Sequence, residues 1–104
     1  MADKCNWRGA SGKGYLYDIY SIDNQWDNVP GNYIFTKRLS PHSWTAVYIG
    51  ETKSFKECLP NHSELPCIRS NGGTHIHAHL NRNTQARLAE EKDLLTNNPT
   101  PCNG

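Results

Sequence analysis

The sequence lacks long apolar runs, a dominant charge sign and closely spaced cysteine pairs. No stretch approaches the roughly 20 apolar residues of a transmembrane helix, so no contact with a membrane is expected. The opening residues MADKCNWRGASGKG contain no apolar core of the kind that defines a secretory signal. We therefore expect a cytoplasmic protein with reduced thiols, in which the four cysteines do not form a disulfide framework.

The formal net charge of the 104-residue chain is only +1. Residues 1–30 carry three basic and four acidic groups, whereas residues 31–104 carry eight basic and six acidic groups. Proteins that follow a phosphate backbone usually show a clear basic excess. The charge is thus compatible with a nucleic-acid partner but does not argue for one.

Four segments have the β-branched and aromatic composition of strands. They are residues 15–22, 31–38, 44–50 and 74–80. The second and third are separated by a short polar loop, which predicts an antiparallel hairpin. Residues 1–14 are polar and glycine-rich and are expected to form a flexible lead-in.

A helical period follows the hairpin. The side chains spaced to share one helix face are Phe55, Cys58, Leu59 and His62. Ser54 and Glu57 form a capping-box pattern at the start of this helix. Because the residue before a proline avoids the helical region, Pro60 leaves the last residue of the helix undetermined. Residues 63–73 are expected to be a loop.

Asn83 can cap a second helix that runs to about Leu95 and stops at Asn97, Asn98 and Pro99. The mixture of strands and helices predicts an α+β fold with a small, mostly antiparallel sheet of three to four strands flanked by helices. Residues 15–104 are expected to form one domain.

One carboxylate of the second helix lies at an unexpected position. The apolar residues of this helix that define an arc of about 120° are Leu88, Leu94 and Leu95. Glu91 falls in the middle of the arc and Glu90 at its edge. Either Glu91 pairs with Arg87, four residues earlier, or it is a metal-binding or proton-handling carboxylate.

Several of these residues, in this order, resemble the motifs of the GIY-YIG nuclease superfamily. The matching residues are Gly31-Asn32-Tyr33, Tyr48-Ile49-Gly50, the following short helix with its leucine and histidine, and Glu91, Leu94, Leu95, Pro99 and Asn103. The resemblance covers roughly residues 30–104 and leaves the first strand outside it.

The resemblance implies metal-dependent hydrolysis of DNA phosphodiesters, usually with magnesium and alternatively with manganese. In such nucleases the glutamate holds the metal, and one tyrosine helps to deprotonate the attacking water. Carried over, Glu91 is the metal ligand, and Tyr33 and Tyr48 line the site. Gly31 and Gly50 would permit close backbone approach.

The resemblance also suggests roles for residues around this set. His62 matches a histidine that often follows the short helix, where it would contact phosphate or cap the helix. Lys56, Arg87 and Asn103 are the candidate substrate-binding residues.

The chain departs from the family pattern at Cys58. Family members usually carry an arginine ten residues after the YIG tyrosine and just before the leucine. Here that position is Cys58, and a thiol cannot offer a phosphate the fixed charge of a guanidinium. Asn32 is a milder departure, because an aliphatic residue is usual there.

His75, His77 and His79 alternate along one predicted strand and therefore share a face. They could present imidazoles to a metal or simply form the polar side of an amphipathic strand. A zinc site built from Cys58, His62 and other cysteines lacks a standard spacing, so zinc is not expected.

Three functions remain open from the sequence. The first is a small metal-dependent DNA nuclease, impaired by the cysteine at the arginine position. The second is a module on the same scaffold that binds nucleic acid or protein without cleaving it. The third is a zinc-stabilised structural protein.

Overall fold

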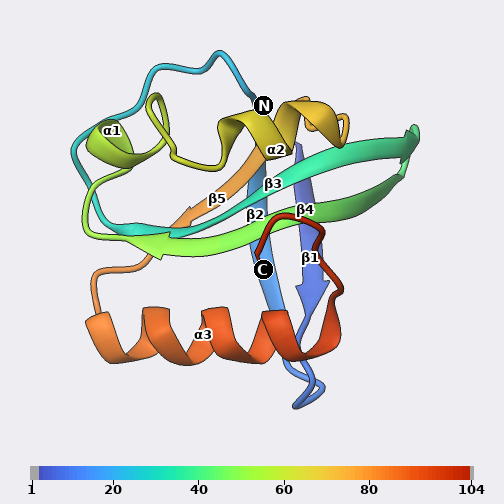
Figure 1. Ribbon diagram of the computed structural model, residues 1–104. Helices are drawn as coiled ribbons and strands as arrows, with labels where there is room; N and C mark the ends of the chain where they lie inside the picture. Colours follow the sequence, from blue (N-terminus) through green and yellow to red (C-terminus); the bar gives the residue numbers. More distant parts are fainter. Residues whose placement is uncertain (1–2, 104) are drawn as a thin grey trace.

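The computed structural model describes residues 3–103, which form an antiparallel five-stranded sheet and three helices (Figure 1). The elements are β1 (Lys4–Arg8), β2 (Gly14–Ser21), β3 (Gly31–Ser40), β4 (Ser43–Thr52), α1 (Phe55–Cys58), α2 (Leu65–Ser70), β5 (His75–Leu80) and α3 (Thr84–Asn97). The strand order is β1-β2-β5-β3-β4. The fold is α+β as expected, but the sheet has five strands and not three to four.

The additional strand is β1, which lies in the expected lead-in. It pairs antiparallel with β2, and Cys5 is opposite Tyr17. Trp7 is buried while its neighbours Asn6 and Arg8 are exposed, so the strand has the period of two of a half-buried edge. The strand has only five residues between polar turns, so its alternating pattern was too short to predict it from the sequence. The expected boundary of the domain stays a prediction.

The second element missed from the sequence is α2. Its six residues span fewer than two turns, which is too short for a helical hydrophobic period to be recognised. The available signal was Pro66 in the first turn, a position where the missing N–H of proline costs nothing. The two predicted caps are confirmed: Ser54 accepts from the N–H of Glu57, and Asn83 accepts from that of Ala86.

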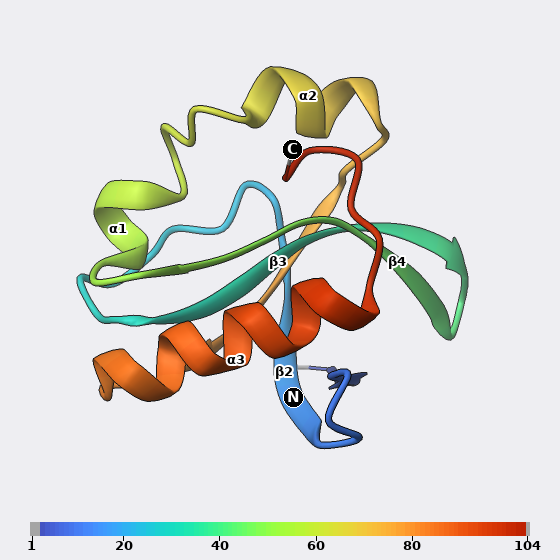
Figure 2. The same ribbon diagram turned by 60° about the horizontal axis from the view of Figure 1, so that its bottom comes forward.

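Helices cover both faces of the sheet, with α1 and α2 on one side and α3 on the other (Figures 1 and 2). The core on the α1–α2 side comprises Tyr33, Phe35, Val47, Phe55, Leu59, Ile68, Ile76, Ala78 and Cys102. The core on the α3 side comprises Trp7, Tyr17, Ile34, Ala46, Ile49 and Leu94. Successive residues of β3 alternate between the two cores, so the central strands are buried on both faces.

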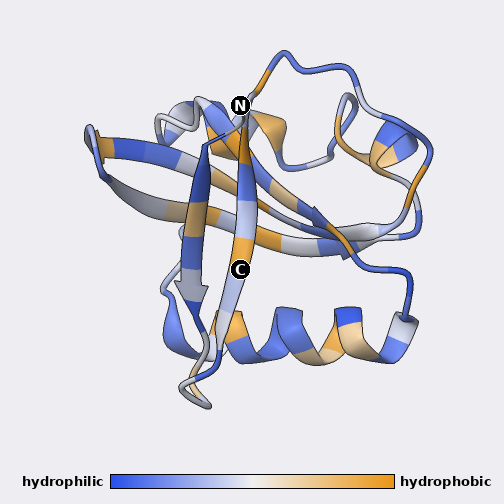
Figure 3. Cartoon of the chain, turned by 180° about the vertical axis from the view of Figure 1, so that it is seen from behind, coloured by the Kyte–Doolittle hydropathy of each residue, from blue (hydrophilic) through white to orange (hydrophobic). Residues whose placement is uncertain are grey.

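Helix α3 buries a charged face, and this corrects the position expected for Glu91. The buried residues are Arg87, Glu90 and Leu94, whereas Glu91 is only half-buried and Leu88 is 49 % exposed. Figure 3 shows that most of α3 is hydrophilic. The leucines therefore did not mark the buried face, because charged groups with partners on the sheet occupy it.

The buried Glu90 links the helix to two strands. Its carboxylate accepts hydrogen bonds from the hydroxyl of Tyr17 and from Nε2 of His79, the latter at 2.6 Å. A buried carboxylate is costly unless it is hydrogen-bonded, and these two donors meet that requirement. His79 therefore has a partner within the chain.

His77 is fully buried between two tryptophans on the α3 side of the sheet. Its Nδ1 accepts from the indole N–H of Trp7 at 2.9 Å, and the Trp44 ring lies edge to face at 4.6 Å. Nε2 has no hydrogen-bond partner among the described residues. The predicted polar face of β5 is thus partly a core layer.

This burial predicts acid destabilisation. Burial lowers the pKa of His77 to about 3, and the nearby His75 and Arg38 act in the same direction. An unfolded histidine titrates near 6.5, so the unfolded chain binds more protons between these values and stability falls as the pH drops through that window. We expect His77 alone to lower the free energy of unfolding by about 1.4 kcal/mol per pH unit below about pH 6.

Urea denaturation of the wild type and of His77→Asn at pH 7 and pH 5 measures this effect. The variant keeps an acceptor for Trp7 and should lose less stability between the two pH values. His42→Asn, at an exposed position, is the control and should behave as the wild type. Equal pH dependence in all three proteins would contradict the assignment.

Candidate active site

Tyr33, Tyr48 and His62 meet on the α1–α2 face of the hairpin formed by β3 and β4. The hydroxyl of Tyr33 lies 2.8 Å from Nε2 of His62. The two tyrosine rings are stacked with centroids 6.1 Å apart, and the His62 ring stands edge to face against Tyr48 at 4.6 Å. Three residues predicted for the site from separate segments thus form one cluster.

The hydrogen bonds of this cluster run in one direction. The backbone N–H of Glu64 donates to Nδ1 of His62 at 3.0 Å, which leaves the proton of the neutral imidazole on Nε2. Nε2 therefore donates to the hydroxyl of Tyr33. Burial lowers the pKa of His62, which keeps the ring neutral at pH 7, although the Glu64 charge acts in the opposite direction.

Only one of the two tyrosines can meet a substrate directly. Tyr33 is 3 % exposed, and burial raises the pKa of its phenol far above 10. Tyr48 is half-exposed; its pKa is also raised, first by burial and then by the Glu91 charge, while Tyr33 acts in the opposite direction. Tyr48 is therefore the accessible member of the cluster.

Gly50 makes room for this arrangement. A Cβ at residue 50 would lie 2.5 Å from the hydroxyl oxygen of Tyr33 and 3.0 Å from a ring carbon of Tyr48. At Gly31 a Cβ would meet the carbonyl oxygen of His79 at 2.2 Å and the Phe55 ring at 2.3 Å. In the structure both glycines admit groups of the chain itself, so their contact with a substrate stays a prediction.

Glu91 reaches the outer edge of β4 from helix α3. Burial and the charge of the Glu51 side chain raise the pKa of Glu91, and the nearby backbone N–H of Glu51, the residue after Gly50, acts against them. The charge of Glu91 in turn raises the pKa of Tyr33 and Tyr48.

Arg87 is held elsewhere and does not pair with Glu91. Its Nε donates to the Glu51 carboxylate at 3.0 Å, one Nη donates to the Asn81 carbonyl, and the other donates to Thr84. The side chain is only 2 % exposed. Arg87 therefore anchors α3 to β4, and it cannot replace the missing arginine without leaving these partners.

The arginine position of the resembling family lies against Tyr33. Cys58 ends α1 and donates its thiol hydrogen to the Tyr33 hydroxyl at a sulfur–oxygen distance of 3.6 Å. Lys56, on the same short helix, is exposed, and its side chain makes no hydrogen bond or ion pair within residues 3–103. The described part of the site thus has no fixed cation beside the tyrosines.

Asn103 binds the backbone of β4. Its amide oxygen accepts from the N–H of Ile49, and its amide nitrogen donates to the carbonyl of the same residue, both at 2.8 Å. The backbone N–H of Cys102 donates to the carbonyl of Val47 at 3.1 Å. Asn103 was expected to bind substrate, but in the structure its side chain fastens the C-terminal segment to the motif-bearing strand.

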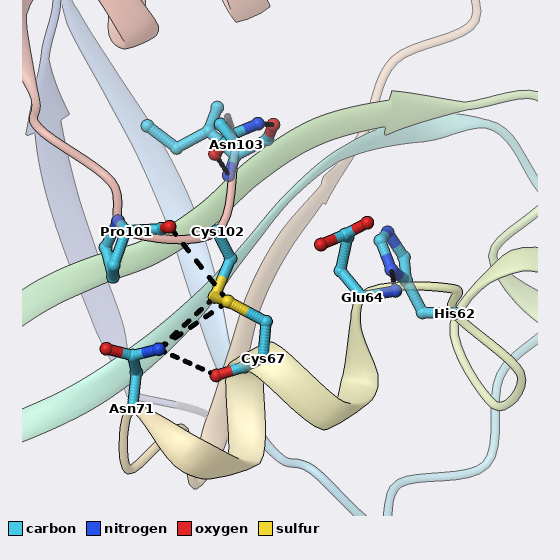
Figure 4. The surroundings of a disulfide bond; sticks show 8 residues. His62, Glu64, Cys67, Asn71, Pro101, Cys102 and Asn103 are labelled. Atoms are coloured by element: carbon cyan, nitrogen blue, oxygen red, sulfur yellow. Dashed lines mark hydrogen bonds between the residues drawn. A yellow bond between two sulfur atoms is a disulfide. The ribbon is translucent and has the colours of Figure 1, made fainter.

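Cys67 and Cys102 form a disulfide bond, which corrects the expectation that the thiols stay reduced (Figure 4). The sequence separation of 35 residues and the absence of a close pair gave no signal for it. Neither sulfur is then free as a thiolate for zinc, whereas Cys5 and Cys58 are free. A hollow of about 300 Å³ lies beside the bond, lined by Tyr48, Glu64, Pro101 and Asn103.

Residues 3–103 contain no group of three or more metal-ligating side chains, so a magnesium site at Glu91 stays a prediction. Mg²⁺ commonly binds through one or two carboxylates and keeps several waters. The raised pKa of Glu91 reflects negative charge crowded at a half-buried position, which a cation would relieve. Glu91 is the residue that would hold the ion.

No helix in residues 3–103 is long and apolar enough to cross a membrane.

The close approach over Gly50 predicts that Gly50→Ala destabilises the protein. The added methyl group must displace the Tyr33 ring, and such overpacking costs about 1–3 kcal/mol. Urea denaturation should show this loss, together with altered near-ultraviolet tyrosine signals. Ser43→Ala, at an exposed position of the same strand, should change stability by less than about 0.5 kcal/mol. An unchanged midpoint for Gly50→Ala would refute the contact.

Neither the models of known protein families nor the curated proteins nor the solved structures include a match to this chain. A relationship to GIY-YIG nucleases therefore stays a prediction, which depends on the motif residues and their spacing in the sequence.

Proposed function

We propose that this protein is a GIY-YIG-like, metal-dependent endonuclease that acts on DNA phosphodiesters and is weakened by the cysteine at position 58. The observation that carries the proposal is the convergence of Tyr33, Tyr48 and His62 beside the carboxylate of Glu91. These residues come from two strands, a loop and a helix. Packing alone does not require a directed hydrogen-bond chain from the Glu64 N–H through His62 to Tyr33, beside the half-exposed phenol of Tyr48.

In this proposal Tyr48 takes the proton of the attacking water. A phenol titrates near 10 and its pKa is raised further here, so the group needs help to lose its proton at neutral pH. The chain provides one part of that help, because Tyr33 lowers the pKa of Tyr48. His62 donates to Tyr33 in turn and fixes its orientation.

Glu91 would hold the cation at the edge of β4, next to the same phenol. A bound divalent ion would polarise the phosphate and stabilise the leaving oxygen. Arg87 and Glu51 orient this edge through their ion pair, and the backbone N–H of Glu51 lowers the pKa of Glu91. These two residues are thus positioning groups in the proposal.

The second candidate function is a binding module that does not cleave. Two contacts favour it: the Cys58 thiol lies against Tyr33, and the guanidinium of Arg87 is buried in other bonds. Loss of one electrostatic donor to a transition state commonly costs about 10²–10³ in rate. A protein with this site would then bind nucleic acid, or a protein partner, and cleave slowly or not at all.

A cytoplasmic location remains part of the proposal. The disulfide bond weighs against it, because cytosolic thiols are generally kept reduced. Disulfides that do occur in the cytosol are usually transient, catalytic or redox-sensing.

The nuclease proposal predicts nicking of supercoiled DNA with Mg²⁺ or Mn²⁺ that stops when a chelator is added. Glu91→Gln keeps the size and polarity of the side chain but loses the charge that would hold the cation. The nicking rate should fall by about 10² or more. Glu57→Gln, at an exposed position, is the matched control and should retain the wild-type rate.

Clean, folded protein that cleaves no form of DNA with either metal would refute the nuclease proposal. Chelator-insensitive binding of nucleic acid at low salt would then support the second function. If the protein binds neither single-stranded nor double-stranded DNA or RNA, the partner in the second function would be a protein.

The position of Cys58 predicts a gain of activity from Cys58→Arg. The guanidinium would enter the site beside Tyr33 and offer the missing fixed charge to the phosphate. Nicking should rise by about 10²–10³ over the wild type. Cys58→Ser controls for loss of the thiol and should leave the rate near that of the wild type. An unchanged rate in folded Cys58→Arg would show that this charge does not limit the activity.

A further inference from the structure

The C-terminal segment after α3 covers the outer edge of β4. Figure 2 shows it passing from the end of α3 along this strand toward α2. The bonds it makes are those of Cys102 to the Val47 carbonyl and of Asn103 to both backbone groups of Ile49. Since β4 is an edge strand, these are the partners of backbone groups that face away from the sheet.

The disulfide bond ties this segment to the rest of the molecule. Residues 98–103 contain no helix or strand, and Cys67 belongs to the short helix α2. The side-chain amide of Asn71 adds weak contacts to both sulfur atoms, as Figure 4 shows. The position of Asn103 on β4 therefore depends on three hydrogen bonds to backbone groups of β4 and on the Cys67–Cys102 disulfide next to it.

The same bond lies next to the candidate active site. Tyr48 stands between Val47 and Ile49, the two residues that the segment holds. The hollow beside Tyr48 has the disulfide, Pro101 and Asn103 as one wall and Glu64 as another. Helix α2 follows directly after Glu64, whose N–H sets the tautomer of His62.

We propose that the Cys67–Cys102 disulfide is a redox-sensitive clamp that keeps Asn103 on β4 and thereby regulates the site at Tyr48. The oxidised form is the competent one, because it holds both sides of the hollow. Reduction releases the C-terminal segment, exposes the Val47–Ile49 edge and loosens Tyr48. The regulatory part rests on the proposed function, whereas the structural part does not.

The exchange reaction consumes two equivalents of a small thiol. One thiolate attacks the Cys67 sulfur, a mixed disulfide forms, and Cys102 leaves as a thiolate that takes up a proton. A second thiolate attacks the external sulfur, which releases the Cys67 thiol and the oxidised form of the small thiol. Attack occurs at Cys67 because that residue is half-exposed, while Cys102 is 5 % exposed.

Amide hydrogen exchange of the full chain, with and without a dithiol reductant, tests the clamp directly. The Ile49 N–H has its partner in Asn103, so its exchange rate should rise about tenfold or more on reduction. Amides of the central strand β3 should change by less than about twofold. Thiol titration must show two additional free thiols in the reduced sample.

Variants separate the clamp from a general loss of stability. Cys102→Ser should show fast Ile49 exchange that no longer responds to reductant, and Cys5→Ser should respond as the wild type does. Asn103→Ala keeps the disulfide and should also expose the Ile49 amide. Unchanged Ile49 exchange on full reduction overturns the proposal, and so does an equal rise throughout β3.

Nicking of DNA by the oxidised and reduced forms, at equal concentration, tests the regulation. A fall of about tenfold or more on reduction supports it. Equal nicking by both forms, with faster Ile49 exchange in one, overturns the regulatory role while the proposed nuclease stands. No nicking by either form refutes the proposed nuclease and its regulation alike, and leaves the exchange experiment to decide the clamp.

Discussion

The outer edge of β4 is the constraint around which the candidate site is built. An edge strand presents backbone N–H and carbonyl groups that would pair with another strand unless something covers them. Here the C-terminal segment binds Val47 and Ile49, and Arg87 of α3 binds the side chain of Glu51. Gly50 lies between these two attachments, and the absence of a side chain there lets Tyr33 approach the edge. Edge protection and assembly of the site thus use the same contacts.

A second consequence of this edge is that α3 is held by charge more than by apolar area. Arg87 pairs with Glu51 on β4, and Glu90 takes bonds from Tyr17 and His79 on the opposite half of the sheet. Each buried charge therefore has a partner on a different strand. Directional bonds of this kind fix the rotation of a helix about its own axis. Apolar contacts alone would permit more rotation. They also determine that Glu91 faces the edge of β4 and not the core.

Local patterns predicted the strands β2 to β5, the caps at Ser54 and Asn83, and the mixed fold class, because each signal lies within a few residues. They failed where the deciding partner was distant in the sequence. The apolar arc placed Glu91 at the centre of the buried face, since nothing in the helix revealed that Arg87 and Glu90 had partners on the sheet. The Cys67–Cys102 bond joins two segments whose proximity only the tertiary fold creates. Of the residues that the motif order selected, Tyr33, Tyr48 and His62 contact one another, and Glu91 acts on the pKa of both tyrosines from helix α3.

The direction of the hydrogen bonds limits what the cluster can do. Because Nδ1 of His62 is occupied by the Glu64 N–H, the imidazole donates to Tyr33 and cannot also take a proton from it through Nε2. The histidine therefore acts as an orienting donor in this arrangement, and not as a general base. In the proposed reaction the proton is accepted by Tyr48, whose pKa is raised by burial and by Glu91 and lowered by Tyr33. That reaction would need a positive charge near Tyr48 at neutral pH, and with a thiol at residue 58 a metal held by Glu91 would have to supply it.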